Sequence, residues 1–233
     1  MKAWKKFTAL VLALGLTAGF AACGGDNSNG GSNNGSSSSS ETVSGTPEQL
    51  DEFAMNALIG ELDTITNFTM VGTRVQEEND EIVHASYTAS FADGKAYQVT
   101  TVTGSVEAAI TYGYIGQEDG TYYSWYSTDN QNWFKTAFPA EVTITSVSAE
   151  YALATLTPWL NYTYFEYNAT TGMHVFSNWG INETQVKVVD GKIVEYKIYD
   201  ASTGSSGELL ESAVITYGNA TVGELPSNAT EVE

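Results

Sequence analysis

The sequence predicts an α+β fold in which a strongly curved antiparallel sheet wraps around an N-terminal helix and a mid-chain helical insertion. Two observations lead to this fold class. Apolar residues recur every three or four positions just after residue 46, but they alternate with polar residues in most segments from residue 67 onward. Short polar turns separate the alternating segments, which predicts an antiparallel meander of about ten strands, too many for a flat sheet.

The first helix is predicted over residues 47–62. Thr46, Pro47 and Gln49 are typical of a helix start, as N-cap, first helical residue and closing residue of a capping box. The expected apolar face of this helix consists of Leu50, Phe53, Ala54, Ala57, Leu58 and Leu62. A second helical stretch is expected over residues 148–156, because alanines surround larger apolar residues there and a proline follows its end.

Strands are expected through the rest of the chain. Their ranges are 67–76, 82–92, 96–103, 106–115, 120–127, 133–138, 162–167, 173–176, 184–189, 192–200 and 210–217. Asp93-Gly94 and Asp190-Gly191 predict tight hairpins, because glycine readily takes the positive φ that such turns require.

Two of these strands carry a regular alternation of apolar and polar residues. The apolar positions are Val83, Ala85, Tyr87, Ala89 and Phe91 on one strand, and Val106, Ala108, Ile110, Tyr112 and Tyr114 on the other. The intervening residues of the first strand are His84, Ser86, Thr88 and Ser90. The sequence therefore predicts one buried face and one solvated face.

Residues 1–22 are typical of an export signal. Three lysines precede an apolar run from Phe7 to Phe20, which is too short to span a bilayer because a spanning helix needs roughly 20 apolar residues. The only cysteine of the chain, Cys23, follows two alanines. The ending Phe20-Ala21-Ala22-Cys23 resembles the bacterial lipobox, in which the cysteine receives a diacylglyceryl group.

This resemblance implies cleavage before Cys23 and an exported protein that is lipid-anchored to the outer face of a bacterial membrane. An ordinary secretory signal cut after Ala21 is the alternative. Residues 23–45 are rich in Gly, Ser and Asn, which predicts a disordered tether of about 26 Å r.m.s. length, similar to those of Gram-positive surface lipoproteins. Residues 46–226 are expected to form a single domain, and residues 227–233 an acidic tail.

The chain is strongly acidic, with 28 Asp and Glu against 9 Lys and Arg. Three of the lysines belong to the signal, so the chain without it has a net charge of −22. This charge argues against nucleic acid as a partner, because such binding needs basic surface. The sequence contains no calcium-loop pattern or other metal-ligand spacing, and we expect neither a metal nor a cofactor.

The order of the expected elements resembles that of the LolA-like lipoprotein carriers, including the LprG-type lipid-carrying lipoproteins of mycobacteria. The shared features are the first helix, the curved meander, the helical insertion and a last strand, Ala213-Val214-Ile215-Thr216-Tyr217, ahead of Pro226. The hairpin over 188–193 also resembles the late hairpin of many small Gram-positive lipoproteins of this shape. The resemblance covers most of 46–226. It implies a half-barrel with an apolar cavity that holds a lipid, an acyl chain or a lipoprotein.

No catalytic signature is present, so we do not expect an enzyme, and both histidines, His84 and His174, are expected at exposed strand positions. The candidate ligand-binding residues are aromatic: Tyr87, Phe91, Tyr112, Tyr114, Trp125 and Trp133. Aromatic packing of the curved sheet on its helix would also account for them. A second functional interpretation is a surface lipoprotein that contacts glycan, cell wall or a protein partner through exposed aromatic residues.

Overall fold

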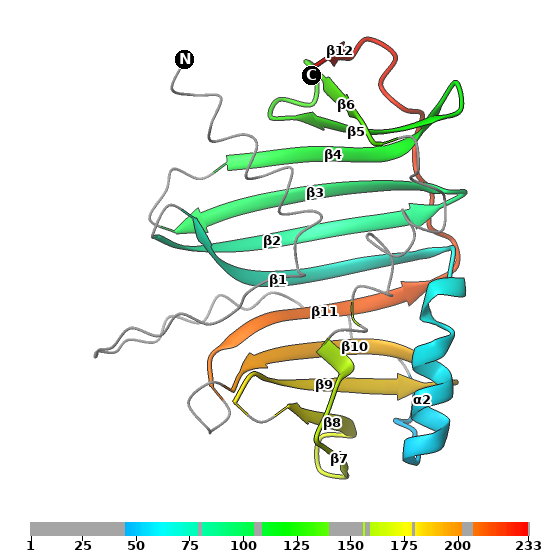
Figure 1. Ribbon diagram of the computed structural model, residues 1–233, viewed down its shortest axis with the longest axis vertical. Coiled ribbons are helices and arrows are strands. Elements are labelled where there is room, and N and C mark those ends of the chain that lie inside the picture. The colour runs from blue at the N-terminus through cyan, green and yellow to red at the C-terminus, as the bar shows by residue number, and fades with distance from the viewer. Residues whose placement is uncertain are drawn as a thin grey trace. The chain divides into compact units, whose positions relative to one another are not determined.

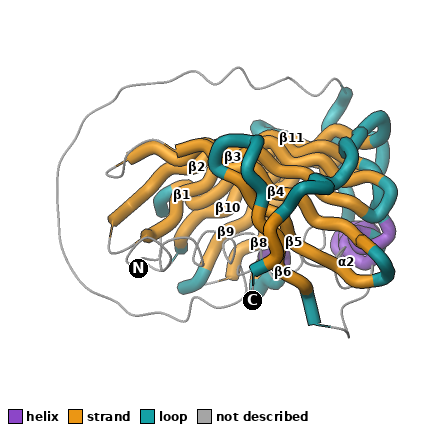
Figure 2. The backbone as a smooth tube through the Cα atoms, turned by 90° about the horizontal axis from the view of Figure 1, so that it is seen from above, coloured by secondary structure: helices purple, strands orange, loops and turns teal. Residues whose placement is uncertain are grey.

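The computed structural model describes residues 45–78, 81–104, 109–139, 156, 159–178, 180–201 and 207–232. One twelve-stranded sheet dominates this part of the chain (Figure 1). The sheet is curved, and its two edge strands, β12 and β7, do not pair with each other, so it remains open (Figure 2). The expected curved antiparallel sheet is therefore confirmed. The helical insertion expected over 148–156 lies outside the described residues, except Leu156.

Most observed strands follow the expected ranges closely, but the strand expected over 106–115 is observed over 109–118, and Val106 and Ala108 lie outside the described residues. They are β1 (Phe68–Glu78), β2 (Glu81–Ala92), β3 (Lys95–Gly104), β4 (Ala109–Glu118), β5 (Thr121–Ser127), β6 (Phe134–Ala137), β7 (Tyr164–Asn168), β8 (Met173–Asn178), β9 (Asn182–Val189), β10 (Lys192–Asp200), β11 (Leu209–Tyr217) and β12 (Thr230–Glu231). The hairpins at Asp93-Gly94 and Asp190-Gly191 have positive φ at both residues, as the turn type requires.

The sheet joins two meanders at its centre. Strands β1 to β6 lie in chain order on one side, and β11 to β7 lie in reverse order on the other. The two halves meet where β1 pairs antiparallel with β11, from Phe68 opposite Tyr217 to Arg74 opposite Glu211. The short strand β12 adds to the outer edge in parallel with β6. The expected acidic tail over 227–233 therefore contributes two residues to the sheet.

One short helix, α2 (Glu52–Gly60), precedes the sheet, followed by a 3₁₀ turn, η1 (Leu62–Thr64). The helix begins five residues later than expected. Its N-cap is Asp51, whose carboxylate accepts a hydrogen bond from the Ala54 N–H at 2.8 Å. The residues before it bind the sheet instead, because the N–H of Glu48 donates to the Val188 carbonyl at 2.9 Å. These contacts compete with helix formation from Thr46.

The buried face of α2 also differs from the expected one. Phe53 is 85 % exposed, whereas Met55 and Leu62 are 1 % exposed and belong to the main core. Leu58 and Ile59 pack beside them, so the inward spacing is 55, 58, 59 and 62. We call the side of the sheet that contacts α2 the helix face, and the opposite side the outer face.

Candidate functional site

The helix face is apolar across eight neighbouring strands, from β3 through β1 and β11 to β7. Its buried core consists of Met55, Leu62, Phe68, Tyr87, Phe91, Leu156, Leu160, Phe176, Val186, Val188, Ile193, Tyr196, Ile198, Ala213 and Ile215. Further half-buried residues, among them Met70, Ala89 and Ala96, extend it. The register explains this continuity, because Phe68 stands opposite both Phe91 and Tyr217.

A polar cluster lies within this apolar face, formed by Tyr87 of β2, Tyr196 of β10 and Glu211 of β11. Both phenol oxygens lie 2.7 Å from the same carboxylate oxygen, Glu211 Oε1, and 2.9 Å from each other. The guanidinium of Arg74, on β1, lies 4.8 Å from the centre of the Tyr87 ring, within the range of a cation–π contact. Four strands thus contribute to this tyrosine–glutamate cluster.

The environment keeps both phenols protonated. Burial, and then the negative charge of Glu211, raise the pKa of Tyr87 well above its ordinary value. Burial also raises the pKa of Tyr196, with smaller contributions from Tyr87 and Glu211. At neutral pH these side chains are hydrogen-bond donors and not nucleophiles. The two phenols therefore donate their hydrogen bonds to the Glu211 carboxylate and link strands β2, β10 and β11.

Gly72 makes room for this cluster. It stands opposite Tyr87 on β1, and a Cβ atom there would lie 2.8 Å from Tyr87 Cζ and 2.5 Å from the backbone oxygen of Ser212. The Tyr87 ring therefore covers a position without a side chain. Arg74, Tyr196 and Glu211 were not among the residues predicted from the sequence. The sequence feature that indicates this cluster is a charged residue at an inward-facing position. Arg74 is separated from Phe68 and Met70 by an even number of positions on the same strand, so its side chain lies on the same face.

The structure divides the six candidate ligand-binding residues between the two faces. Tyr87 and Phe91 lie on the helix face and are buried, as the alternation on β2 predicts. Tyr112 pairs with Val99, and Val99 with Thr88, so Tyr112 lies on the outer face, as does Tyr114. These four candidates therefore lie on opposite faces of the sheet and do not line one cavity. The tight turn at Asp93-Gly94 sets Phe91 opposite Ala96, which brings Ile115, and not Tyr114, to the helix face.

Trp125 and Trp133 belong to an aromatic cluster on the outer-face side of β4 and β5. Trp125 is opposite Tyr114 and is fully buried, and the Trp133 ring centre lies 5.3 Å from that of Tyr114. The chain after β11 crosses this region, because Leu225 sits where a Gly116 side chain would be. The Thr230 N–H also donates to the Trp133 carbonyl at 2.8 Å. These tryptophans are packing residues and not an exposed platform.

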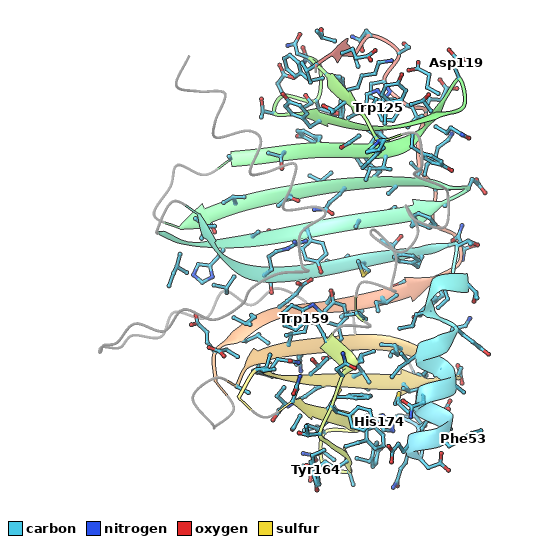
Figure 3. The ribbon with its side chains drawn as sticks, in the orientation of Figure 1. Phe53, Asp119, Trp125, Trp159, Tyr164 and His174 are labelled. Carbon is cyan, nitrogen blue, oxygen red and sulfur yellow. The ribbon has the colours of Figure 1, made fainter. Side chains whose placement is uncertain are left out.

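His174 is buried on β8, which corrects the expectation of an exposed histidine, whereas His84 is exposed as expected. The Nε2 atom of His174 accepts a hydrogen bond of 2.9 Å from the backbone N–H of Leu50, the residue directly before the N-cap of α2. The ring also stacks on Phe165, with ring centres 5.8 Å apart. Figure 3 shows His174 and Trp125 in opposite halves of the sheet. Burial lowers the pKa of His174, which favours the neutral form that this hydrogen bond requires.

We therefore expect the free energy of unfolding to fall as the pH is lowered from 7 to 5.5. Below about pH 6.5 the unfolded chain binds a proton that folded His174 does not, so the slope reaches at most about 1.4 kcal/mol per pH unit. Urea unfolding at several pH values measures this slope. His174→Gln should flatten it, whereas His84→Gln should leave it unchanged. Equal slopes in all three proteins would contradict this assignment.

Other kinds of site gain no support in the described part of the chain. No group of three or more His, Cys, Asp or Glu side chains there is arranged to hold a metal ion. Within the same residues, no helix is long and apolar enough to cross a membrane. Cys23, the expected lipidation site, lies outside the described residues. Comparison with known proteins finds neither a matching family model nor a matching curated protein.

Proposed function

We propose that this protein is an exported lipoprotein, anchored through lipid on Cys23, that binds an apolar ligand such as a lipid or an acyl chain against its helix face. The order of the helices and strands resembles that of the LolA-like and LprG-type half-barrel carriers, and this resemblance supports the same interpretation. Binding, and not catalysis, is the role we assign to it. The tyrosine–glutamate cluster would then contact the polar end of the ligand.

The observation that carries this proposal is the mismatch between the apolar face and the helix that covers it. Eight neighbouring strands extend over about 34 Å, whereas a nine-residue helix is only about 13 Å long and 10 Å wide. Figure 1 shows α2 across one end of β11, β10 and β9. Most side chains of this face are buried, but Met70, Ala89 and Ala96 at its margin are only half-buried. Accessible apolar surface next to a buried core is where an acyl chain would pack.

Native mass spectrometry tests the proposal on the chain from Gly24 onward, which omits the signal and the lipidated cysteine. We expect a retained adduct of lipid mass, identified after solvent extraction. Ala89→Trp should abolish the adduct, because residue 89 is a half-buried position of the helix face next to the core. The matched control is Thr88→Trp, one residue away and exposed on the outer face.

The two variants separate ligand binding from folding. Both should keep the far-UV circular dichroism of the parent chain. A chain that stays free of adduct after incubation with membrane phospholipid vesicles would overturn the proposal. An adduct that survives Ala89→Trp but not Thr88→Trp would move the ligand to the opposite side of the sheet.

A further inference from the structure

The central strands of the sheet carry uncharged side chains on their outer face, although the chain as a whole is strongly acidic. Five adjacent strands, β11, β1, β2, β3 and β4, each present three outward side chains at alternate positions. These positions are 212, 214 and 216; 69, 71 and 73; 86, 88 and 90; 97, 99 and 101; and 110, 112 and 114. These fifteen outward side chains are eight Ser or Thr, three Tyr and four Val or Ile. None is charged and none is buried, although the chain has 28 acidic residues. We call this surface the neutral patch.

The neighbouring strands show that an uncharged outer face is not a general property of this sheet. On β9 and β10 the outward positions include Glu183, Lys187, Glu195 and Lys197. Glu195 and Lys197 form a salt bridge of 3.0 Å. Charge is thus present on one part of the face and absent from the adjoining part. The cores of protein–protein interfaces are likewise depleted of charged residues and enriched in tyrosine, so this composition is that of a contact surface.

The neutral patch is organised in straight rows that run across the strands. One row consists of Val214, Val71, Thr88, Val99 and Tyr112, each opposite the next. Its members are spaced by the distance between strands, about 4.8 Å, so the row extends over about 19 Å. That spacing is close to the length of one hexose unit in an extended polysaccharide. Each sugar would therefore meet one strand.

The side chains of the patch also match sugar chemistry. Tyr97 and Tyr112 are half-buried, which leaves part of each ring for the C–H face of a sugar ring, whereas Tyr114 packs against both Tyr97 and Trp133. Ser and Thr hydroxyls both donate and accept hydrogen bonds, as sugar hydroxyls do. Val71 is 53 % exposed and adds apolar contact between them.

We propose that the neutral patch binds a neutral polysaccharide. Anionic polymers are repelled by a chain of net charge −22, and cationic ones would prefer the acidic surface elsewhere. A second copy of the chain meets the same repulsion, and more than half of the patch is hydroxyl-bearing instead of apolar. An uncharged polymer avoids both penalties. The patch lies opposite the helix face, so this proposal does not depend on lipid binding.

Affinity electrophoresis tests the proposal with the mature lipoprotein in non-ionic detergent, on native gels that contain starch, β-1,3-glucan, galactomannan or xylan. We expect at least one of these polymers to retard the protein equally at low and high salt, because the contact involves no charge. Thr88→Glu, at the centre of the patch, should weaken retardation about tenfold or more, since contact would bury an unpaired carboxylate. Tyr112→Ala should act in the same direction.

Matched controls lie on the same face of the sheet, outside the patch. Gln185→Glu on β9 and Tyr199→Ala on β10 introduce the same chemistry and should leave retardation unchanged. No retardation by any of the four polymers would overturn the proposal. So would equal retardation of the Thr88→Glu protein, salt-sensitive retardation, or a dimer in sedimentation analysis that Thr88→Glu dissociates.

Discussion

Gly72→Ala is expected to lower the free energy of unfolding by about 3 kcal/mol, the upper part of the usual range for overpacking. The new methyl group would meet the Ser212 backbone oxygen at 2.5 Å, and the Ala213 Cβ and Tyr87 Cζ at 2.8 Å. A backbone atom cannot move aside as a flexible side chain does, so β1 and β11 must separate or Tyr87 must leave the cluster. Denaturant unfolding followed by tryptophan fluorescence measures the loss.

Gly60→Ala is the matched control for that experiment. Gly60 is the last residue of α2, and no atom lies within 4 Å of a Cβ built there. The same substitution should therefore stabilise the protein by about 0.5 to 1 kcal/mol, because alanine loses less backbone entropy in a helix. Unfolding curves of Gly72→Ala that coincide with those of the parent would show that the central strands are less tightly packed than described.

Cys23→Ser is expected to release the protein from the membrane completely. Each buried CH₂ group of an acyl chain contributes about 0.8 kcal/mol to membrane binding, and serine cannot carry the thioether-linked diacylglyceryl group. Phase partition in a cloud-point detergent measures the result. The parent protein should enter the detergent phase and Cys23→Ser the aqueous phase.

Ser37→Ala, in the tether, is the control and should partition like the parent. Recovery of the parent protein in the aqueous phase, with a new N-terminus at residue 22, would instead support the ordinary secretory signal. In that case Cys23 would remain a free thiol of an exported chain.

The strands could be predicted because their signals are local. Alternation of apolar and polar residues located β2 to within one residue, and Asp-Gly turns located two tight hairpins. A third hairpin of the same kind, at Asp119-Gly120, was not predicted. The short strand β12 was missed, because two residues, Thr230 and Glu231, show no period at all. Its position depends on hydrogen bonds to β6, which lies about 100 residues earlier in the sequence.

Which face a strand presents was harder to predict than the strand itself. On β4 the alternating positions Ile110, Tyr112 and Tyr114 are the more apolar set, yet they face outward. Tyrosine is amphipathic and packs well on a half-exposed surface. The inward set, Thr111, Gly113 and Ile115, is determined by register transmitted through two hairpins. Local hydrophobicity does not encode that register.

The N-terminal helix and the polar cluster depended on contacts between distant residues. Thr46 and Pro47 satisfy every local rule for a helix start, but the Glu48 and Leu50 N–H groups bind Val188 and His174. In the same way, Tyr87, Tyr196 and Glu211 come from three strands that meet only when β1 pairs with β11. No spacing within the sequence reveals such a cluster.

The pairing of β1 with β11 also has a consequence for export. If the protein is exported as we propose, β1 would leave the membrane channel before the other strands, and one of its two edges would stay without its partner until almost the whole chain had followed. Contacts between such distant segments form slowly, because a long loop must close before they are gained. The chain would therefore pass the channel in an extended conformation. Folding would be completed on the far side, where β11 pairs with β1 at the centre of the sheet.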